Sequence, residues 1–304
     1  RRYANQEDFN SDLAHRASLE AIEDAGIDKE EIDYIIFATN FGEVDVNGIP
    51  NFMPSLSARL KGKLGIKRRD CINYDMIFGC PGWVEGLILA DTMIKAGKAK
   101  TVLVVGGETL SRVTDPYDRN KMIFADGAGA VIVTATEDSK VGVLADNTLC
   151  DNGEELCYLE NGPSLNLEHN QSQLFIRMRG RKIYEYALKN VPDAIKATID
   201  KAGLDISDIH KILIHQANAK MDYAMIGRLF KLYGKKDYDH AISPMTIQQF
   251  GNSSVATVPT LFDLIRKGKM KGQSFTPGSH IIFTSVGAGM NINCVVYKFP
   301  EGKI

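Results

Sequence analysis

Cys80, His215 and Asn252 are the residues of this chain best suited to chemistry on a carbonyl group. A thiolate is a strong nucleophile, and imidazole and carboxamide N–H groups can stabilise negative charge on an oxygen. An internal repeat relates two of them, because one shift of 172 residues pairs Cys80 with Asn252 and also Leu89 with Leu261. We therefore predict one active site, with Cys80 as the nucleophile and His215 and Asn252 beside it.

The segment around Cys80 suits a nucleophile. Residues 80–95 are predicted to form a helix, and Pro81 fits its first position because a missing N–H costs nothing there. The partial positive charge at a helix N-terminus lowers a thiol pKa and favours the thiolate, and Gly79 leaves room for a substrate. The alternative is a buried structural cysteine, which is the commonest fate of a free thiol.

His215 and Asn252 each have a second interpretation. His215 lies at the carboxyl end of a predicted buried strand, where open α/β sheets bind ligands; a lone histidine there can also be a hydrogen-bonded core residue. Asn252 suits a helix N-cap, and that role still allows its carboxamide to face a cleft. After the strand at 280–284, Gly287 and Gly289 let a backbone N–H approach an oxyanion, the alternative being a simple turn.

Strands and helices alternate along the chain and must position these residues. Helices are predicted over residues 10–25, 54–64, 80–95, 180–202, 219–233 and 253–267, and strands over 33–39, 70–74, 101–105, 128–134, 141–145, 210–214, 280–284 and 291–297. Strands that are apolar on both faces and alternate with helices indicate α/β layers. We expect residues 128–134 and 141–145 to pair as a hairpin, residues 146–173 to form an irregular connection, and Pro192 to kink or divide its helix.

A second repeat supports two similar halves. Residues 22–39 and 199–216 align without gaps at a shift of 177. We expect an N-terminal half over residues 1–172, including the irregular connection, and a C-terminal half over residues 173–304. An approximate two-fold axis between the halves would bring Cys80 and its counterpart Asn252 close to each other.

Composition bounds the class of protein. The 304 residues are 44% hydrophobic and 24% charged, which is typical of a soluble globular chain. A formal charge of −2 and a pI near 6.4 give no electrostatic reason to expect nucleic-acid binding, and no apolar run approaches the ~20 residues of a membrane span. Five irregularly spaced cysteines without a secretory signal predict a cytoplasmic setting without metal. Because the sequence begins at Arg1 instead of methionine, we expect a natural N-terminal portion to be missing.

Several motifs together resemble the thiolase-fold condensing enzymes, most closely the β-ketoacyl-acyl-carrier-protein synthase III (ketosynthase III) family. The motifs are the Cys80 segment and residues 115–119, 124–130, 214–218 and 250–254. The resemblance covers nearly the whole chain. It implies a duplicated α/β fold in which two pseudo-two-fold-related halves form five layers, αβαβα.

The resemblance also implies a reaction. Cys80 takes the acyl group from an acyl-coenzyme A primer, and His215 and Asn252 hold the thioester carbonyl of malonyl-acyl carrier protein during decarboxylation. A Claisen condensation then gives 3-oxoacyl-acyl carrier protein and CO₂, the first step of fatty-acid or related synthesis. The backbone N–H groups of Cys80 and Gly289 would form the oxyanion hole. Acyl-coenzyme A and malonyl-acyl carrier protein are substrates, and no cofactor is implied.

Further site residues follow from the same resemblance. Arg119 would contact the coenzyme A nucleotide, and Lys220 would face the acyl carrier protein. Phe52 or Met53 would cross the interface of a homodimer and close the acyl pocket of the partner. Asn218 and Gly287 complete the expected substrate-binding residues.

Some positions depart from the family pattern and leave alternatives open. Pro81 replaces a small residue, Gly287-Ala288-Gly289 replaces a run of glycines, and Met53 stands where an aromatic residue is expected. Met53 and the irregular segment 146–173 leave the primer open, and a medium or branched acyl chain or a specialised pathway is an alternative. The alternative functions are an acyltransferase or hydrolase of such a pathway and a non-catalytic partner subunit.

Overall fold

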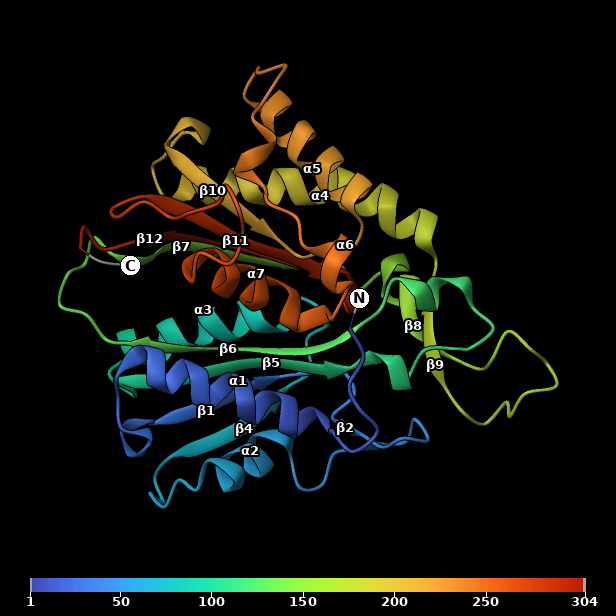
Figure 1. The fold of residues 1–304 in the computed structure, drawn as a ribbon. Coiled ribbons are helices and arrows are strands. Elements are labelled where there is room, and N and C mark those ends of the chain that lie inside the picture. The colour runs from blue at the N-terminus through green and yellow to red at the C-terminus, as the bar shows by residue number, and fades with distance from the viewer. Residues whose placement is uncertain (1, 303–304) are drawn as a thin grey trace.

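Two four-stranded sheets form the frame of this computed structural model, which describes residues 2–302 (Figure 1). The first sheet has the strand order β4 (Ile72–Met76), β1 (Tyr34–Ala38), β5 (Thr101–Thr109), β6 (Asp126–Thr134). The second has the order β10 (Ile209–Ile214), β11 (His280–Gly287), β12 (Asn291–Lys298), β7 (Gly142–Cys150). In both sheets a parallel pair is followed by an antiparallel strand, β6 beside β5 and β12 beside β11.

Helices cover both faces of each sheet and give five layers (Figure 1). The outer helices of the first sheet are α1 (Asn10–Ala25) and α2 (Leu56–Leu64). The central layer holds α3 (Gly82–Lys95) and α7 (Thr257–Arg266), which pack between the two sheets. On the far side of the second sheet lie α4 (Gly180–Lys201) and α5 (Ala219–Leu232). The expected αβαβα arrangement is therefore confirmed.

Alternating side chains of the central strands bind the layers together. In β1, Ile36 joins Trp83 of α3 in the core between the sheets, whereas Ile35 and Phe37 pack outward with α1 and α2. Successive strand side chains point to opposite faces, so a strand covered on both sides must be apolar throughout. The near-continuous apolar run in β1 has this origin.

The repeated sequences fold into repeated local structures. Gly26 and Gly203 both have left-handed backbones, with φ of 64° and 71°, and each follows the end of a helix. Asp28 and Asp205 then accept a backbone N–H at the start of a short 3₁₀ helix in each half. These matched caps set equivalent directions for β1 and β10, so the duplication in the sequence is a duplication of structure.

The predicted hairpin between residues 128–134 and 141–145 is wrong. β6 pairs with β5 in the first sheet, and β7 pairs with β12 in the second. Apolar alternation identifies a strand but not its partner, and each strand here completes the edge of a different sheet. β7 also continues to Cys150, so a strand that precedes residue 173 belongs to the second sheet.

Pro192 does not divide its helix, because α4 runs without interruption from Gly180 to Lys201. Its buried face, which includes Val191 and Ile195, packs in the core of the second half, and this packing favours a continuous helix. The predicted helix over 253–267 instead consists of the 3₁₀ turn Ser254–Ala256 followed by α7. The change of helix type coincides with a positive φ at Ser254.

Short elements complete the chain. They are β2 (Glu43–Val44), β3 (Pro50–Asn51), β8 (Leu159–Gly162), β9 (Phe175–Met178) and α6 (Ile247–Phe250). β8 and β9 pair with each other, so the segment expected to be irregular contains an ordered strand. Among residues 2–302, the helices are too short or too polar to cross a lipid bilayer.

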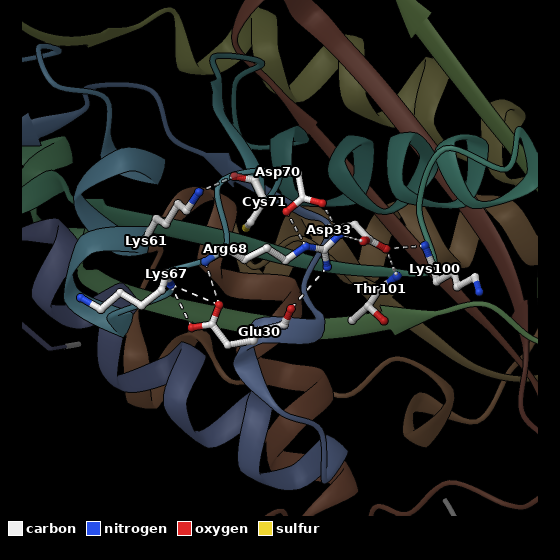
Figure 2. Close-up of polar contacts among 9 residues, drawn as sticks. All are labelled: Glu30, Asp33, Lys61, Lys67, Arg68, Asp70, Cys71, Lys100 and Thr101. Atoms are coloured by element: carbon white, nitrogen blue, oxygen red, sulfur yellow. Dashed lines mark hydrogen bonds and ion pairs between the residues drawn. The ribbon is translucent and has the colours of Figure 1, made fainter.

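A polar network joins the N-terminal ends of neighbouring strands in the first sheet (Figure 2). The Arg68 guanidinium lies between two carboxylates, 2.7 Å from Asp33 Oδ1 and 2.8 Å from Asp70 Oδ1. Asp33 also accepts the backbone N–H groups of Lys100 and Thr101 at 2.6 and 3.1 Å. Burial opposes the ionisation of Asp33, but these hydrogen bonds hold its pKa below the ordinary value. The network joins the loops before β1, β4 and β5.

Candidate active site

Two interlocking glycine loops place Cys80 between β4 and α3. Gly79 has φ of 68°, and a Cβ on it would lie 2.7 Å from the backbone N and O of Ala288. A Cβ on Gly287 would lie 2.5 Å from the backbone N of Cys80. Only glycine permits such close approach, so both glycines determine where the Cys80 backbone lies. Pro81 follows with helical dihedrals, and α3 begins at Gly82.

Cys80 is partly buried, and its thiol has one hydroxyl partner. Its Sγ lies 3.2 Å from Ser254 Oγ, which donates a hydrogen bond to it. Burial raises the pKa of the Cys80 thiol to about 11, although the Ser254 hydrogen bond acts in the opposite direction. The expectation of a low pKa at this helix N-terminus is therefore wrong for the protein without substrate, because burial penalises the thiolate.

Asn252 is held in the loop before α7. Its backbone N–H donates to Ile123 at 2.9 Å and its carbonyl accepts from Ala125 at 2.9 Å, which ties the loop to the first half. Its side-chain Oδ1 accepts the Ser254 N–H at 2.7 Å. Because that contact fixes the carboxamide oxygen, the amide N–H₂ is the end available to a substrate oxygen. Asn252 is not the helix N-cap, since that position is Ser253, but its carboxamide oxygen still binds a backbone N–H at the start of this turn.

His215 follows β10 directly and is buried. Its Nδ1 lies 2.7 Å from Thr257 Oγ1, and the same Oγ1 lies 2.9 Å from the carbonyl oxygen of Ser254. Burial lowers the pKa of His215 to about 4, so the imidazole is neutral near pH 7. The single proton on Oγ1 can serve one of these two acceptors. If it goes to the Ser254 carbonyl, Nδ1 carries the ring proton and donates to Oγ1, and if it goes to Nδ1, the ring proton resides on Nε2.

Ser254 is the residue that connects the three predicted site residues. Its hydroxyl contacts Cys80, its N–H contacts Asn252, and its carbonyl oxygen contacts Thr257, the partner of His215. Its φ of 52° is rare for a residue other than glycine. Sequence reasoning missed Ser254 and Thr257 because serine and threonine are common around helix starts. The only sequence signal was the position of Ser254 two residues after Asn252.

A cavity of about 340 Å³ opens beside Cys80 and Ser254. Its apolar lining residues are Phe41, Ile77, Phe78, Leu110, Phe124, Leu159, Ile176 and Ala288. Leu159 and Ile176 come from β8 and β9, so the connecting segment between the halves supplies one wall. A cavity with largely apolar walls that reaches a partly buried thiol can hold an acyl chain on that thiol.

The other predicted residues lie in different places. Gly289 lines the same cavity as Cys80, whereas Gly287 packs against the Cys80 backbone. Asn218 caps α5 by accepting the N–H groups of Lys220 and Met221 at 3.0 and 3.3 Å. Lys220 is exposed in the first turn of that helix.

Arg119, Phe52 and Met53 do not line the cavity within this chain. Arg119 is exposed at the start of a 3₁₀ helix. Phe52 and Met53 are 50% and 86% exposed, on the segment after β3. In residues 2–302 there is also no group of three or more His, Cys, Asp or Glu side chains that could hold a metal ion.

Comparisons with known proteins agree with this geometry. A family model described as 3-oxoacyl-[acyl-carrier-protein (ACP)] synthase III matches residues 74–152, and its C-terminal counterpart matches residues 199–299. A β-ketoacyl-[acyl-carrier-protein] synthase III of Erythrobacter litoralis is 35% identical over 97% of this chain and 86% of its own length.

Solved structures show the same similarity. The 3-oxoacyl-[acyl-carrier-protein] synthase III of Aquifex aeolicus superposes with a TM-score of 0.81 at 30% identity, covering 98% of this chain and 87% of that chain. The priming β-ketosynthase of the R1128 polyketide biosynthetic pathway superposes with a TM-score of 0.82 at 27% identity, covering 99% and 84%.

Proposed function

The chain belongs to the 3-oxoacyl-[acyl-carrier-protein] synthase III family of condensing enzymes, and on this premise we propose that Cys80, His215 and Asn252 carry its reaction. The reaction joins an acyl-coenzyme A primer to malonyl-acyl carrier protein. The observation that carries the assignment is that Ser254 contacts Cys80, Asn252 and Thr257, the partner of His215, while Cys80 and Ser254 line a largely apolar cavity.

Acyl transfer comes first. The Cys80 thiol gives up its proton as Sγ attacks the thioester carbonyl of the primer, and that proton passes to the departing sulfur, so coenzyme A leaves as its thiol while the acyl group stays on Sγ. The negative charge on the carbonyl oxygen is stabilised by the backbone N–H groups of Cys80 and Gly289. The apolar cavity then holds the acyl chain and excludes water from the new thioester.

Condensation follows at His215 and Asn252. Nε2–H of neutral His215 and the amide N–H₂ of Asn252 donate to the thioester carbonyl oxygen of the malonyl group. As CO₂ leaves, the bond between the malonyl methylene carbon and its carboxylate breaks, and its electrons form the enolate. The N–H groups of His215 and Asn252 stabilise the negative charge on the enolate oxygen. The enolate carbon attacks the acyl-Cys80 carbonyl, and the thiolate of Cys80 departs to regenerate the enzyme.

Binding surfaces outside the cavity complete the proposal. Arg119, Asn218 and Gly287 contact the primer and its coenzyme A, and exposed Lys220 attracts the acidic acyl carrier protein. The exposure of Phe52 and Met53 fits insertion into a second copy of the chain, so the proposed enzyme acts as a homodimer. Its proposed location is the cytoplasm. The reaction uses no cofactor, because thioester chemistry needs only acid–base groups and hydrogen-bond donors.

The primer is the least determined part of the reaction. Structural similarity to a priming β-ketosynthase of a polyketide pathway favours a specialised pathway as the second candidate. The cavity of about 340 Å³ has mostly large apolar side chains along its walls, which fits a primer longer than acetyl.

The test is intact-mass analysis after incubation with short, medium and branched acyl-coenzyme A. We expect one acyl adduct on the wild type, no adduct on Cys80→Ala, and an unchanged adduct on Cys150→Ala, whose thiol is exposed elsewhere. The favoured primer identifies the acyl class. Acylation that persists in Cys80→Ala would contradict the assignment of the nucleophile, and absence of CO₂ release from malonyl-acyl carrier protein would favour an acyltransferase or hydrolase.

A further inference from the structure

A buried glutamate is connected to the thiol of Cys80 through two intervening side chains. Glu108, at the end of β5, is fully buried. Its Oε1 accepts the backbone N–H of Asn40 at 2.7 Å and Asn40 Nδ2 at 2.8 Å. Asn40 Nδ2 also donates to Ser254 Oγ at 2.9 Å, and Ser254 Oγ donates to Cys80 Sγ at 3.2 Å. The catalytic steps above use neither Glu108 nor Asn40.

The protons of this chain of hydrogen bonds have one consistent arrangement. The Asn40 amide has two N–H groups, and one faces Glu108 while the other faces Ser254. Glu108 Oε1 can accept the Asn40 hydrogen bonds in either ionisation state, as long as the proton of a neutral carboxyl sits on the other oxygen. That oxygen, Oε2, lies 3.4 Å from Thr39 Oγ1. Ser254 Oγ therefore receives a hydrogen bond from Asn40, and its own proton is left for Cys80.

The backbone of Ser254 supports the same arrangement. A positive φ in a residue other than glycine costs free energy and persists where the surroundings enforce it, commonly at functional sites. Here φ is 52°, and the Ser254 N–H is held by Asn252. This strained conformation is the one that points Oγ at both Asn40 and Cys80.

We propose that Glu108 and Asn40 are positioning residues that orient the Ser254 hydroxyl so that it donates to Cys80 Sγ and favours the thiolate. The inference rests on the proposed role of Cys80 as nucleophile. Neither residue is a base for the thiol, because the Asn40 amide stands between Glu108 and Ser254 and does not transfer protons. Burial raises the pKa of Glu108 to about 8, so near pH 7 the carboxyl adds little negative charge beside the thiol.

The test is the pH profile of Cys80 alkylation by iodoacetamide, followed on the Cys80 peptide by mass spectrometry between pH 6.5 and 8. In Asn40→Asp a carboxylate oxygen replaces the amide N–H₂ and takes the Ser254 proton for itself. We expect the alkylation rate to fall about tenfold at each pH, as for a thiol pKa higher by about one unit. In Ser254→Gly we expect the alkylation rate of Cys80 to fall by a similar factor. The thermal unfolding midpoint should stay unchanged, because glycine accepts the positive φ.

Controls separate orientation from charge and from general damage. Ser253→Ala alters the neighbouring serine, which has no contact with Cys80, and should match the wild type. Glu108→Gln keeps an acceptor oxygen for Asn40 and should stay within about twofold of the wild-type rate. In a Ser254→Gly background, Asn40→Asp should add little, because the two residues act through one hydrogen bond.

Two results would overturn the proposal. One is an unchanged alkylation profile in a folded Asn40→Asp variant. The other is a full additional loss when Asn40→Asp is placed in the Ser254→Gly background, since that would show a direct charge effect. Alkylation needs neither acyl-coenzyme A nor carrier protein, so a wild type that alkylates as expected but accepts no acyl group refutes the proposed function and leaves the orientation of Ser254 intact.

Discussion

The Thr257 hydroxyl has one proton and two acceptors within reach, His215 Nδ1 at 2.7 Å and the Ser254 carbonyl oxygen at 2.9 Å. Donation to the Ser254 carbonyl would leave the ring proton on Nδ1, which would then donate to Oγ1. We propose that the hydroxyl turns to the histidine instead, because the Ser254 carbonyl also accepts the backbone N–H of Thr257. In that state Nε2 carries the ring proton and can donate to the malonyl thioester. Thr257 would thus select the tautomer on which decarboxylation depends.

We predict that Thr257→Val slows decarboxylation of malonyl-acyl carrier protein by about 10- to 100-fold while acyl transfer to Cys80 changes much less. The substitution keeps the shape of the side chain but removes the partner of His215 Nδ1. Separate assays of CO₂ release and of acyl-enzyme formation measure the two steps. Thr198→Val, which removes a buried hydroxyl bonded within α4, is the matched control. Equal losses in both steps would contradict a role in the tautomer.

Residue types in the sequence pointed to the proposed reactive groups but not to their partners. Cys80, His215 and Asn252 were found from the repeat and from strand and helix ends. Asn40 and Ser254 are 214 positions apart, and their contact exists only because the two halves pack face to face. The sign of the Cys80 pKa shift was likewise missed, because burial depends on the same packing.

At the scale of elements, Asp33 anchors the starts of neighbouring strands in the first sheet (Figure 2). It accepts two backbone N–H groups at residues 100 and 101 and pairs with Arg68. We predict that Asp33→Ala lowers the free energy of unfolding by roughly 1–2 kcal/mol, because both N–H groups lose their acceptor.

Denaturant unfolding of three proteins measures this effect. Asp70→Ala is the control, since Asp70 pairs with the same arginine but is largely exposed, with a side-chain exposure of 74%. Exposed ion pairs contribute little, so Asp70→Ala should stay close to the wild type. A loss in Asp70→Ala as large as in Asp33→Ala would show that Arg68 pairing, and not the backbone acceptor, stabilises this edge.

Helices and strands could be predicted from the sequence where local signals are strong, but the partners of the strands could not. The helix Asn10–Ala25 ends at Gly26 as expected, because a left-handed C-cap is a local property. The partners of β6 and β7 depend on which sheet edge is open, which no local pattern encodes. In the same way, the apolar face of α4 outweighs the break expected at Pro192.

At the scale of the whole molecule, the duplication places equivalent elements back to back. The shift of 172 residues aligns α3 with α7, and each helix carries the same ion pair, Lys95 with Asp91 at 2.7 Å and Lys267 with Asp263 at 3.1 Å. The two helices form the central layer, and the loops before them supply Cys80 and Asn252. The internal repeat, which is visible in the sequence, therefore accounts for the equivalent positions of Cys80 and Asn252 in the two halves.

Burying the site makes the stability of the whole fold depend on pH in two opposite ways. His215 has its pKa lowered to about 4, so its contribution is complete above about 6.5 and is lost as pH falls toward 4. Glu108 has its pKa raised to about 8, so its contribution is complete below about 4.5 and is lost as pH rises toward 8. Buried Asp222, whose pKa is also raised, acts in the same direction as Glu108.

Between about pH 6.5 and 8 the buried carboxyl groups ionise more readily in the unfolded chain than in the folded protein. The wild type should therefore lose stability as pH rises through that window. Glu108→Gln cannot ionise, so we predict that it gains roughly 1–2 kcal/mol relative to the wild type from pH 6.5 to pH 8. Urea unfolding at several pH values measures the difference. A constant difference between the two proteins would mean that Glu108 ionises in the folded state as readily as in the unfolded chain. Any decline that remains in Glu108→Gln comes from other groups whose pKa values burial raises, which include Asp222 and Asp91.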